Sequence, residues 1–175
     1  MALQLVEFTV DGRDRASADT VIDSAAEVLR VSGAELIEAQ VPVGHERVFL
    51  IAHEENPGTV ADALAASDLE HDDLAEVRLV GADLDAVRGQ VAETGYLVEW
   101  DLPEGLSMDS YLARKAEKAP LYAQVPESRF LRTYVREDMG KCLCFYDAPD
   151  AAAVERAREA VDTPVDRLHE LDRGA

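Results

Sequence analysis

Two cysteines and a few polar side chains in the second half of the chain could form a reactive site. Cys142 and Cys144 lie two residues apart in a stretch with the composition of a β-strand. Such residues share one face of a strand about 6–7 Å apart, at the upper limit for a disulfide, so we expect reduced thiols. Cys144 or Tyr134 could be the reactive group, with Arg132 as an anion anchor and Glu99 as a general base.

The same groups could instead hold a metal ion. Thiolate, imidazole and carboxylate ligands together suit a soft or borderline ion such as zinc, nickel or copper. His169 is the strongest histidine candidate because it lies in a predicted strand. The candidate ligands are Cys144, His169, Glu99 and Glu7, which come from separate strands.

Each of these residues also has a purely structural interpretation. Cys144 can be a small buried hydrophobic residue, and Tyr134 can be an ordinary strand residue that packs. Arg132 and Glu99 can form a plain cross-strand ion pair. The sequence leaves both interpretations open.

The candidate residues lie in the second of two similar halves. Leu5-Val6-Glu7-Phe8 returns as Leu97-Val98-Glu99-Trp100. Residues 36–41 (LIEAQV) then align with 130–135 (FLRTYV), and 47–53 (RVFLIAH) with 141–147 (KCLCFYD). Because the matches keep their order and nearly their spacing, we interpret the chain as a tandem repeat.

Each half has the same predicted order of elements, β-α-β-β-α-β, which is the ferredoxin-like split motif. Ser17 is the expected N-cap and Gly33 the expected C-cap of the first helix, and Pro120 should end or kink the third. In the first half we expect strands at 3–10, 34–43, 47–54 and 74–80 and helices at 17–32 and 57–67. In the second half we expect strands at 95–102, 130–137, 141–147 and 166–171 and helices at 107–123 and 150–161.

This order predicts an α+β fold in which two ferredoxin-like repeats pack sheet to sheet as a pseudo-dimer, like a dimeric α+β barrel. One copy leaves one face of its sheet bare, and the other copy could cover it. The expected domains are residues 1–80, a connecting segment at 81–94 that includes a short helix, and residues 95–172.

Strand alternation indicates which side chains lie on the face away from the helices. Leu143 and Phe145 suit the helix-covered face, so their neighbours should point away from it. The expected set on the open face is Arg132, Tyr134, Cys142, Cys144 and Tyr146, with His169, Glu99 or both joining from the outer strands.

The charge of the chain excludes several partners. Lys and Arg number 17 against 36 Asp and Glu, which gives a net charge of −19. Such a field repels nucleic acids and anionic membranes. The apolar runs are too short to cross a bilayer, and the N-terminus lacks the pattern of a secretion signal. We therefore expect a soluble, cytoplasmic protein whose partner is a metal ion or a small molecule, and which could form homo-oligomers beyond the internal pseudo-dimer.

Four stretches of the second half form a distinctive set, namely 96–103 (YLVEWDLP), 130–135 (FLRTYV), 144–150 (CFYDAPD) and 163–168 (TPVDRL). Together they resemble a large family of small bacterial domains known as nickel-binding proteins. The resemblance covers about residues 94–172 and implies a ferredoxin-like fold, dimeric packing of sheets and, in the member that named the family, bound nickel. The first half departs from it, because residues 50–55 (LIAHEE) lack the Cys and the Ala-Pro of the motif.

Two classes of function follow. The first is a soluble metal-binding protein that holds nickel or a similar divalent transition metal in or beside the second repeat. The alternative is a small enzyme without an organic cofactor, monooxygenase- or isomerase-like, that uses a cavity between the two sheets. The sequence alone does not decide whether the protein is an enzyme.

Overall fold

The computed structural model describes residues 1–174 and contains two compact units, Met1–Val77 and Arg78–Arg173. Both units have the element order β-α-β-β-α-β that the sequence predicts, and the fold is α+β. The arrangement of the two sheets as a pseudo-dimer, and with it a cavity between them, stays a prediction. The boundary between the units falls inside strand β4, near the predicted domain end at residue 80.

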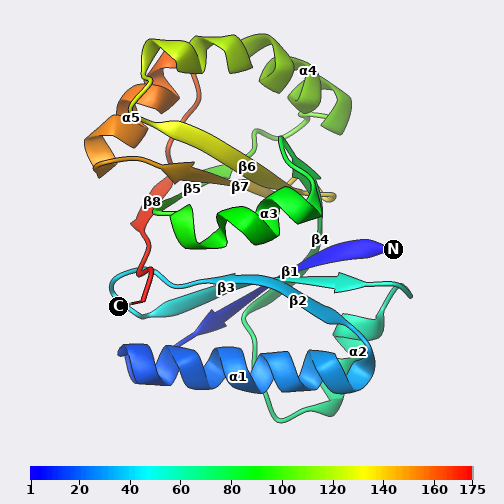
Figure 1. The fold of residues 1–175 in the computed structure, drawn as a ribbon. Helices are drawn as coiled ribbons and strands as arrows, with labels where there is room; N and C mark the ends of the chain where they lie inside the picture. The colour runs from blue at the N-terminus through cyan, green and yellow to red at the C-terminus, as the bar shows by residue number, and fades with distance from the viewer. Residues whose placement is uncertain (175) are drawn as a thin grey trace. The chain divides into compact units, whose positions relative to one another are not determined.

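The first unit is an antiparallel sheet with two helices on one face (Figure 1). Its strand order is β2-β3-β1-β4. Its elements are β1 (Ala2–Thr9), α1 (Arg15–Ser32), β2 (Glu35–Gln40), β3 (Arg47–Glu54), α2 (Thr59–Ala66) and β4 (Asp73–Val80). The core under the helices is apolar and includes Val6, Phe8, Leu29, Val48 and Leu50.

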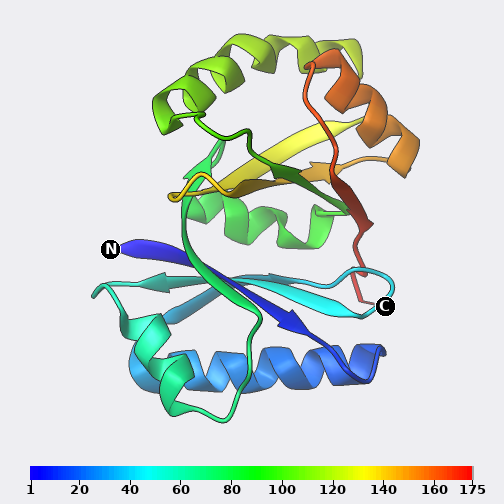
Figure 2. The ribbon, with the colours of Figure 1, turned by 180° about the vertical axis from the view of Figure 1, so that it is seen from behind.

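The second unit has the equivalent strand order, β6-β7-β5-β8, and helices α4 and α5 cover one face of its sheet (Figure 2). It begins with α3 (Leu84–Gln90) and a short 3-10 turn inside the connecting segment that was expected to be helical. The remaining elements are β5 (Tyr96–Asp101), α4 (Met108–Lys118), the 3-10 helix η2 (Ala119–Gln124), β6 (Arg129–Arg136), β7 (Lys141–Asp147), α5 (Ala151–Ala160) and β8 (Arg167–Glu170).

The helix ends follow from capping residues. Gly33 ends α1 with φ of +84°, a left-handed conformation that favours glycine, as predicted. The N-cap of α1 is Asp14 rather than the predicted Ser17, whose backbone N–H donates to the Asp14 carboxylate. As predicted, the α-helical part of α4 ends just before Pro120, which lies in the 3-10 helix that follows.

One prediction about strand β7 was wrong. Cys142, Cys144 and Tyr146 do not point away from the helices but belong to the core beneath α4 and α5. Because Leu143 and Phe145 alternate with them, these two lie on the other face. Both sets of side chains in β7 are largely apolar, so hydrophobic alternation does not distinguish its two faces.

A register shift in β6 puts Phe130 on a different face of the sheet from Arg132. The pairing of β6 with β7 slips between Phe130 and Arg132, as at a β-bulge, which moves the preceding residue to the other face. The ring of Phe130 therefore packs on the helix side against Tyr122 and Tyr146. Uninterrupted alternation along the strand would put this ring on the same face as Arg132.

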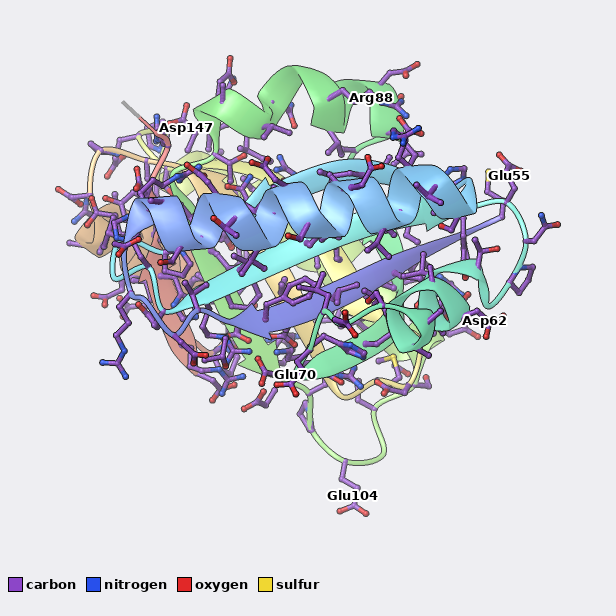
Figure 3. The ribbon with its side chains drawn as sticks, turned by 90° about the horizontal axis from the view of Figure 1, so that it is seen from below. Glu55, Asp62, Glu70, Arg88, Glu104 and Asp147 are labelled. Carbon is purple, nitrogen blue, oxygen red and sulfur yellow. The ribbon has the colours of Figure 1, made fainter. Side chains whose placement is uncertain are left out.

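Exposed acidic side chains account for part of the net charge. Glu55 after β3, Asp62 of α2 and Glu104 in the loop before α4 project outward (Figure 3). Within residues 1–174, no helix combines the length and apolar character needed to cross a bilayer.

Candidate functional site

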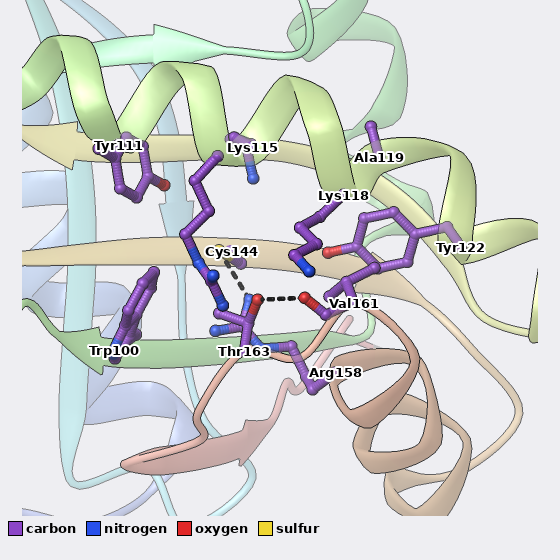
Figure 4. Close-up of a pocket in the computed structure, with 11 residues that line it drawn as sticks. Trp100, Tyr111, Lys115, Lys118, Ala119, Tyr122, Cys144, Arg158, Val161 and Thr163 are labelled. Carbon is purple, nitrogen blue, oxygen red and sulfur yellow. Dashed lines mark hydrogen bonds between the residues drawn. The ribbon is translucent and has the colours of Figure 1, made fainter.

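The second unit contains a small pocket between the sheet, α4, η2 and the loop that follows α5. Its cavity measures about 30 Å³, which is room for one or two water-sized molecules. Cys144 lies at its floor, Trp100 and Tyr111 lie together at one end, and Tyr122 is at the other (Figure 4).

The position of Cys144 follows from its strand. β7 lies between β6 and β5, and Cys144 faces Thr133 on one neighbour and Val98 on the other. This central place leaves its side chain 1% exposed. Cys144 is nevertheless among the residues that line the cavity.

Three polar groups surround the sulfur of Cys144. The Thr133 hydroxyl donates to it at 3.2 Å, and Nη1 of Arg158 donates at 3.4 Å. The sulfur of Cys142 lies 3.9 Å away. A buried structural cysteine with apolar neighbours has none of these donors, so the surroundings of Cys144 are those of a sulfur that carries negative charge.

The pKa values of the two thiols move in opposite directions. The hydrogen bond from Cys142 and the positive charges of Lys115 and Arg158 hold the pKa of Cys144 well below its ordinary value, although burial acts the other way. The hydrogen bond to Cys144 and burial raise the pKa of Cys142. The cations beside Cys144 therefore favour the anionic form of this thiol over that of Cys142.

Arg158 connects the sulfur to a pair of tyrosines. Its Nη1 also donates to the hydroxyl of Tyr146 at 3.2 Å, and that hydroxyl lies 2.8 Å from the hydroxyl of Tyr122. Nη2 donates to the Pro164 carbonyl at 2.7 Å. Burial alone would lower the pKa of Arg158, but Cys144, Tyr146 and Tyr122 together outweigh it and raise the pKa, so the guanidinium stays charged. Burial raises the pKa of Tyr122 to about 12, so this phenol stays protonated near neutral pH.

Helix α4 adds three more cations to the pocket, namely Arg114, Lys115 and Lys118. The two lysines lie in the last turn, where the helix dipole favours positive charge. With Arg158, four cations line one small cavity of a protein whose net charge is −19. The pocket therefore favours an anion, or a reaction in which negative charge develops.

Glu99 and His169, two of the predicted ligands, do meet. His169 Nε2 lies 2.8 Å from Oε2 of Glu99. The same carboxylate accepts hydrogen bonds from Lys141 at 2.7 Å and from Arg167 at 2.9 Å. Burial alone would raise the pKa of Glu99, but these donors outweigh it and hold the pKa well below the ordinary value. A carboxylate held in this way is a poor general base, and it is already occupied by other donors.

The remaining predicted residues lie elsewhere. In the pairing of β5 with β7, Val98 is opposite Cys144 and Glu99 is opposite Leu143, so Cys144 and Glu99 lie on opposite faces of the sheet. Arg132 and Tyr134 lie on the face away from α4 and α5. The Arg132 guanidinium is 4.8 Å from the ring centroid of Phe145, and Tyr134 packs against the same ring. Glu7 belongs to the first unit, where Arg47 pairs with it at 3.1 Å.

The donor set does not fit a resident divalent cation. Within residues 1–174, no three side chains of the types His, Cys, Asp and Glu are grouped so that they could hold a metal ion. The two thiols that do meet lie beside Arg158 and Lys115, whose positive charges oppose a second cation.

Sequence reasoning missed Arg158, although a signal was present. Val154, Ala157, Arg158 and Val161 follow the i, i+3, i+4, i+7 spacing of a buried helix face, and all four are buried. An arginine at a core position of such a stripe needs a buried partner. That pattern could have directed attention to the helix side of β7.

Comparison with known proteins confirms the family resemblance of the second half. Residues 96–171, less than half of the chain, match the family model described as nickel responsive protein SCO4226-like. No curated protein sequence matches the chain.

The chain is also similar to solved structures. A crystal structure described as a chlorite dismutase, TA0507, has a TM-score of 0.54 and 16% sequence identity, and the match covers 99% of this chain and 95% of that one. A monooxygenase described from Fusobacterium nucleatum matches with a TM-score of 0.44 at 12% identity, over 97% of this chain and 90% of that one. The first likeness supports the α+β fold alone, and the second is too weak to carry an argument.

Proposed function

We propose that the second unit binds a small molecule in the Cys144 pocket and that the thiolate of Cys144 is the group that responds to it. The observation that carries this proposal is the sulfur of Cys144 at the floor of a cavity, held between Thr133 and Arg158. The thiolate is the nucleophilic and thiophilic form of cysteine, so these contacts support reactivity rather than simple packing.

This proposal keeps the reactive group of the enzyme hypothesis but puts the site in a different pocket. Cys144 stays the reactive group, and no organic cofactor is involved. The pocket lies between the sheet of the second unit and its own helices, and Arg158 takes the role of anion anchor that the sequence suggested for Arg132.

Alkylation of the native protein tests the proposal. Iodoacetamide reacts with the thiolate, so the rate of modification of Cys144 against pH reports its pKa. We expect modification at Cys144 with a midpoint below about 8.5, the value for an ordinary cysteine. Arg158→Met should raise that midpoint, and Cys144→Ser should abolish the modification.

Two controls make the result specific. Cys142→Ser leaves Cys144 as the single thiol and so identifies the modified residue. His71→Gln changes an exposed side chain of the first unit and should alter neither rate nor midpoint. A midpoint at or above the ordinary value, or modification only after unfolding, would contradict the proposal.

The family match favours nickel binding as a second candidate function. The second unit would then bind nickel or a similar divalent ion, and the residues to test are Glu99 with His169 on one face of the sheet and, separately, Cys144 on the other. Equilibrium dialysis against Ni²⁺ at high salt measures this binding. Binding that survives salt and is lost in Cys144→Ser or His169→Gln supports it. Weak binding that salt removes equally from all variants indicates attraction to the acidic surface alone.

A further inference from the structure

The surroundings of Cys144 combine a thiolate, a hydroxyl donor, a guanidinium and a very small cavity. We propose that Cys144 is oxidised by a small hydroperoxide, for which hydrogen peroxide is the probe, so that the second unit reduces or senses peroxide. This inference rests on the proposed function, because it needs Cys144 to react as a thiolate.

The cavity limits the size of the substrate. Its volume of about 30 Å³ corresponds to one or two water-sized molecules, and hydrogen peroxide has two oxygen atoms. A hydroperoxide with a bulky organic group has less room beside Cys144 than hydrogen peroxide has. The size of the cavity therefore favours the smallest member of the class.

The donors lie where the reaction needs them. Thr133 and Arg158 approach the sulfur from β6 and α5, and they hold it beside the cavity. Arg158 lines the same cavity, so its guanidinium is the expected donor to a peroxide oxygen bound there.

The chemical step balances with the groups on hand. The sulfur of Cys144 attacks one peroxide oxygen, a sulfur–oxygen bond forms and the oxygen–oxygen bond breaks. The sulfur is oxidised to sulfenic acid, and the other oxygen leaves as hydroxide, which takes a proton from solvent to give water. Arg158 and Lys115 stabilise the negative charge that develops on the leaving oxygen.

The neighbouring cysteine is poorly placed to close a disulfide. Cys142 and Cys144 are two residues apart in one strand, so their Cα atoms lie near the upper limit for a bridge. We therefore expect the sulfenic acid to persist until an external small thiol reduces it. Two equivalents of such a thiol return Cys144 to the thiol form and yield one disulfide and one water.

The test treats the reduced full chain with hydrogen peroxide in the presence of a metal chelator. Excess peroxide is then removed and the protein is unfolded in dimedone, which traps sulfenic acids without having to enter the pocket. Mass spectrometry of the modified peptide identifies the oxidised residue. We expect a dimedone adduct on Cys144 that forms at least about tenfold faster in the wild type than in Arg158→Met. Thr133→Val, which keeps the shape and removes the hydroxyl donor, should slow the reaction without preventing folding.

A bulky hydroperoxide, cumene hydroperoxide, tests the size argument in the same assay. We expect it to react at least about tenfold more slowly than hydrogen peroxide. Equal rates for the two peroxides, or a dimedone adduct on Cys142 instead of Cys144, would overturn the inference.

Alkylation separates this inference from the proposed function. Fast alkylation of Cys144 together with peroxide oxidation no faster than that of free cysteine overturns the peroxide inference and leaves the reactive thiolate. Slow alkylation together with slow oxidation overturns both. If Arg158→Met does not fold, the rates of alkylation and of oxidation are measured on Cys142→Ser instead, which retains only Cys144.

Discussion

The two units share a fold but differ in what lies under their helices. In the first unit, β3 places Val48, Leu50 and Ala52 against α1 and α2. In the second unit, β7 places Cys142, Cys144 and Tyr146 at the three aligned positions. The first unit shows that the fold needs only apolar side chains at these positions. Burying polar groups there costs free energy unless each is paired, and in the second unit Arg158 pairs with both Cys144 and Tyr146.

Both units also contain an ion pair at aligned positions. Glu7 pairs with Arg47 at 3.1 Å, and Glu99 pairs with Lys141 at 2.7 Å. The sequence alignment superposes these pairs, because Glu7 matches Glu99 and Arg47 matches Lys141. An ion pair that occurs with and without a thiol pocket is best explained as part of the fold. This comparison assigns Glu99 a structural role, in keeping with the proposal that Cys144 is the reactive group.

The sharpest way to test the comparison is to give the second unit the apolar core of the first. Arg158→Leu alone should destabilise the protein by about 3–5 kcal/mol, because buried partners such as the Tyr146 hydroxyl and the Pro164 carbonyl lose their donor. The double variant Cys144→Leu with Arg158→Leu should recover part of that loss, since the polar sulfur that faced the guanidinium is then gone as well. Urea denaturation followed by circular dichroism measures the free energy of unfolding. A double variant that is no more stable than Arg158→Leu would show that the pair is not coupled.

Removing the Glu99 carboxylate should have the next largest effect. Glu99→Gln should cost about 1–3 kcal/mol, because three donors lose their charged acceptor. The pKa of Glu99 is lower in the folded protein than its ordinary value of 4.5. The contribution of Glu99 to the free energy of unfolding is therefore complete above about pH 4.5. It is lost as the pH falls from there through the lower pKa of the folded protein. The variant should show a weaker loss of stability in acid than the wild type.

Glu7→Gln is the matched change in the first unit. It should lower the free energy of unfolding but leave the alkylation of Cys144 unchanged, and so should Glu99→Gln. A large fall in the alkylation rate with Glu99→Gln would give this residue a role in the chemistry and break the comparison.

The Tyr146 hydroxyl should contribute a smaller amount. Tyr146→Phe keeps the ring and removes the hydroxyl that joins Arg158 to Tyr122. The expected cost is about 1 kcal/mol, the size of a net hydrogen bond in a folded protein, and urea denaturation measures it. The aligned Ala52 of the first unit has no hydroxyl, so Ala52→Ser offers the reverse change. It should destabilise the first unit, because the new hydroxyl would be buried in an apolar core.

Lys115 should affect reactivity more than stability. Lys115→Met removes one cation near Cys144, so the pKa of Cys144 should rise and alkylation near neutral pH should slow several-fold. Because the side chain is half-buried at the edge of the pocket, we expect a change in stability of about 0.5 kcal/mol or less. An unchanged pH profile of alkylation would show that this lysine does not act on the sulfur.

Much of the fold could be predicted because it depends on local patterns. The two-residue period of the strands and the helical spacing in 17–32 and 150–161 determine the elements within a few residues. Capping chemistry at Gly33 and the break at Pro120 follow from backbone geometry that neighbouring residues hardly influence. The family motif of the second half is likewise a local pattern, and the family model matches it.

The sequence by itself therefore determined the elements, their order in each half and the unusual polar content of the second half. Only the tertiary structure decided which face of β7 the cysteines occupy, because Leu143 and Phe145 are as suitable for a core as Cys142 and Cys144. It also decided that Arg158, fourteen residues beyond Cys144, is the partner of its sulfur. Contacts between residues distant in the chain depend on how helix α5 packs on the sheet, and no local pattern encodes that packing.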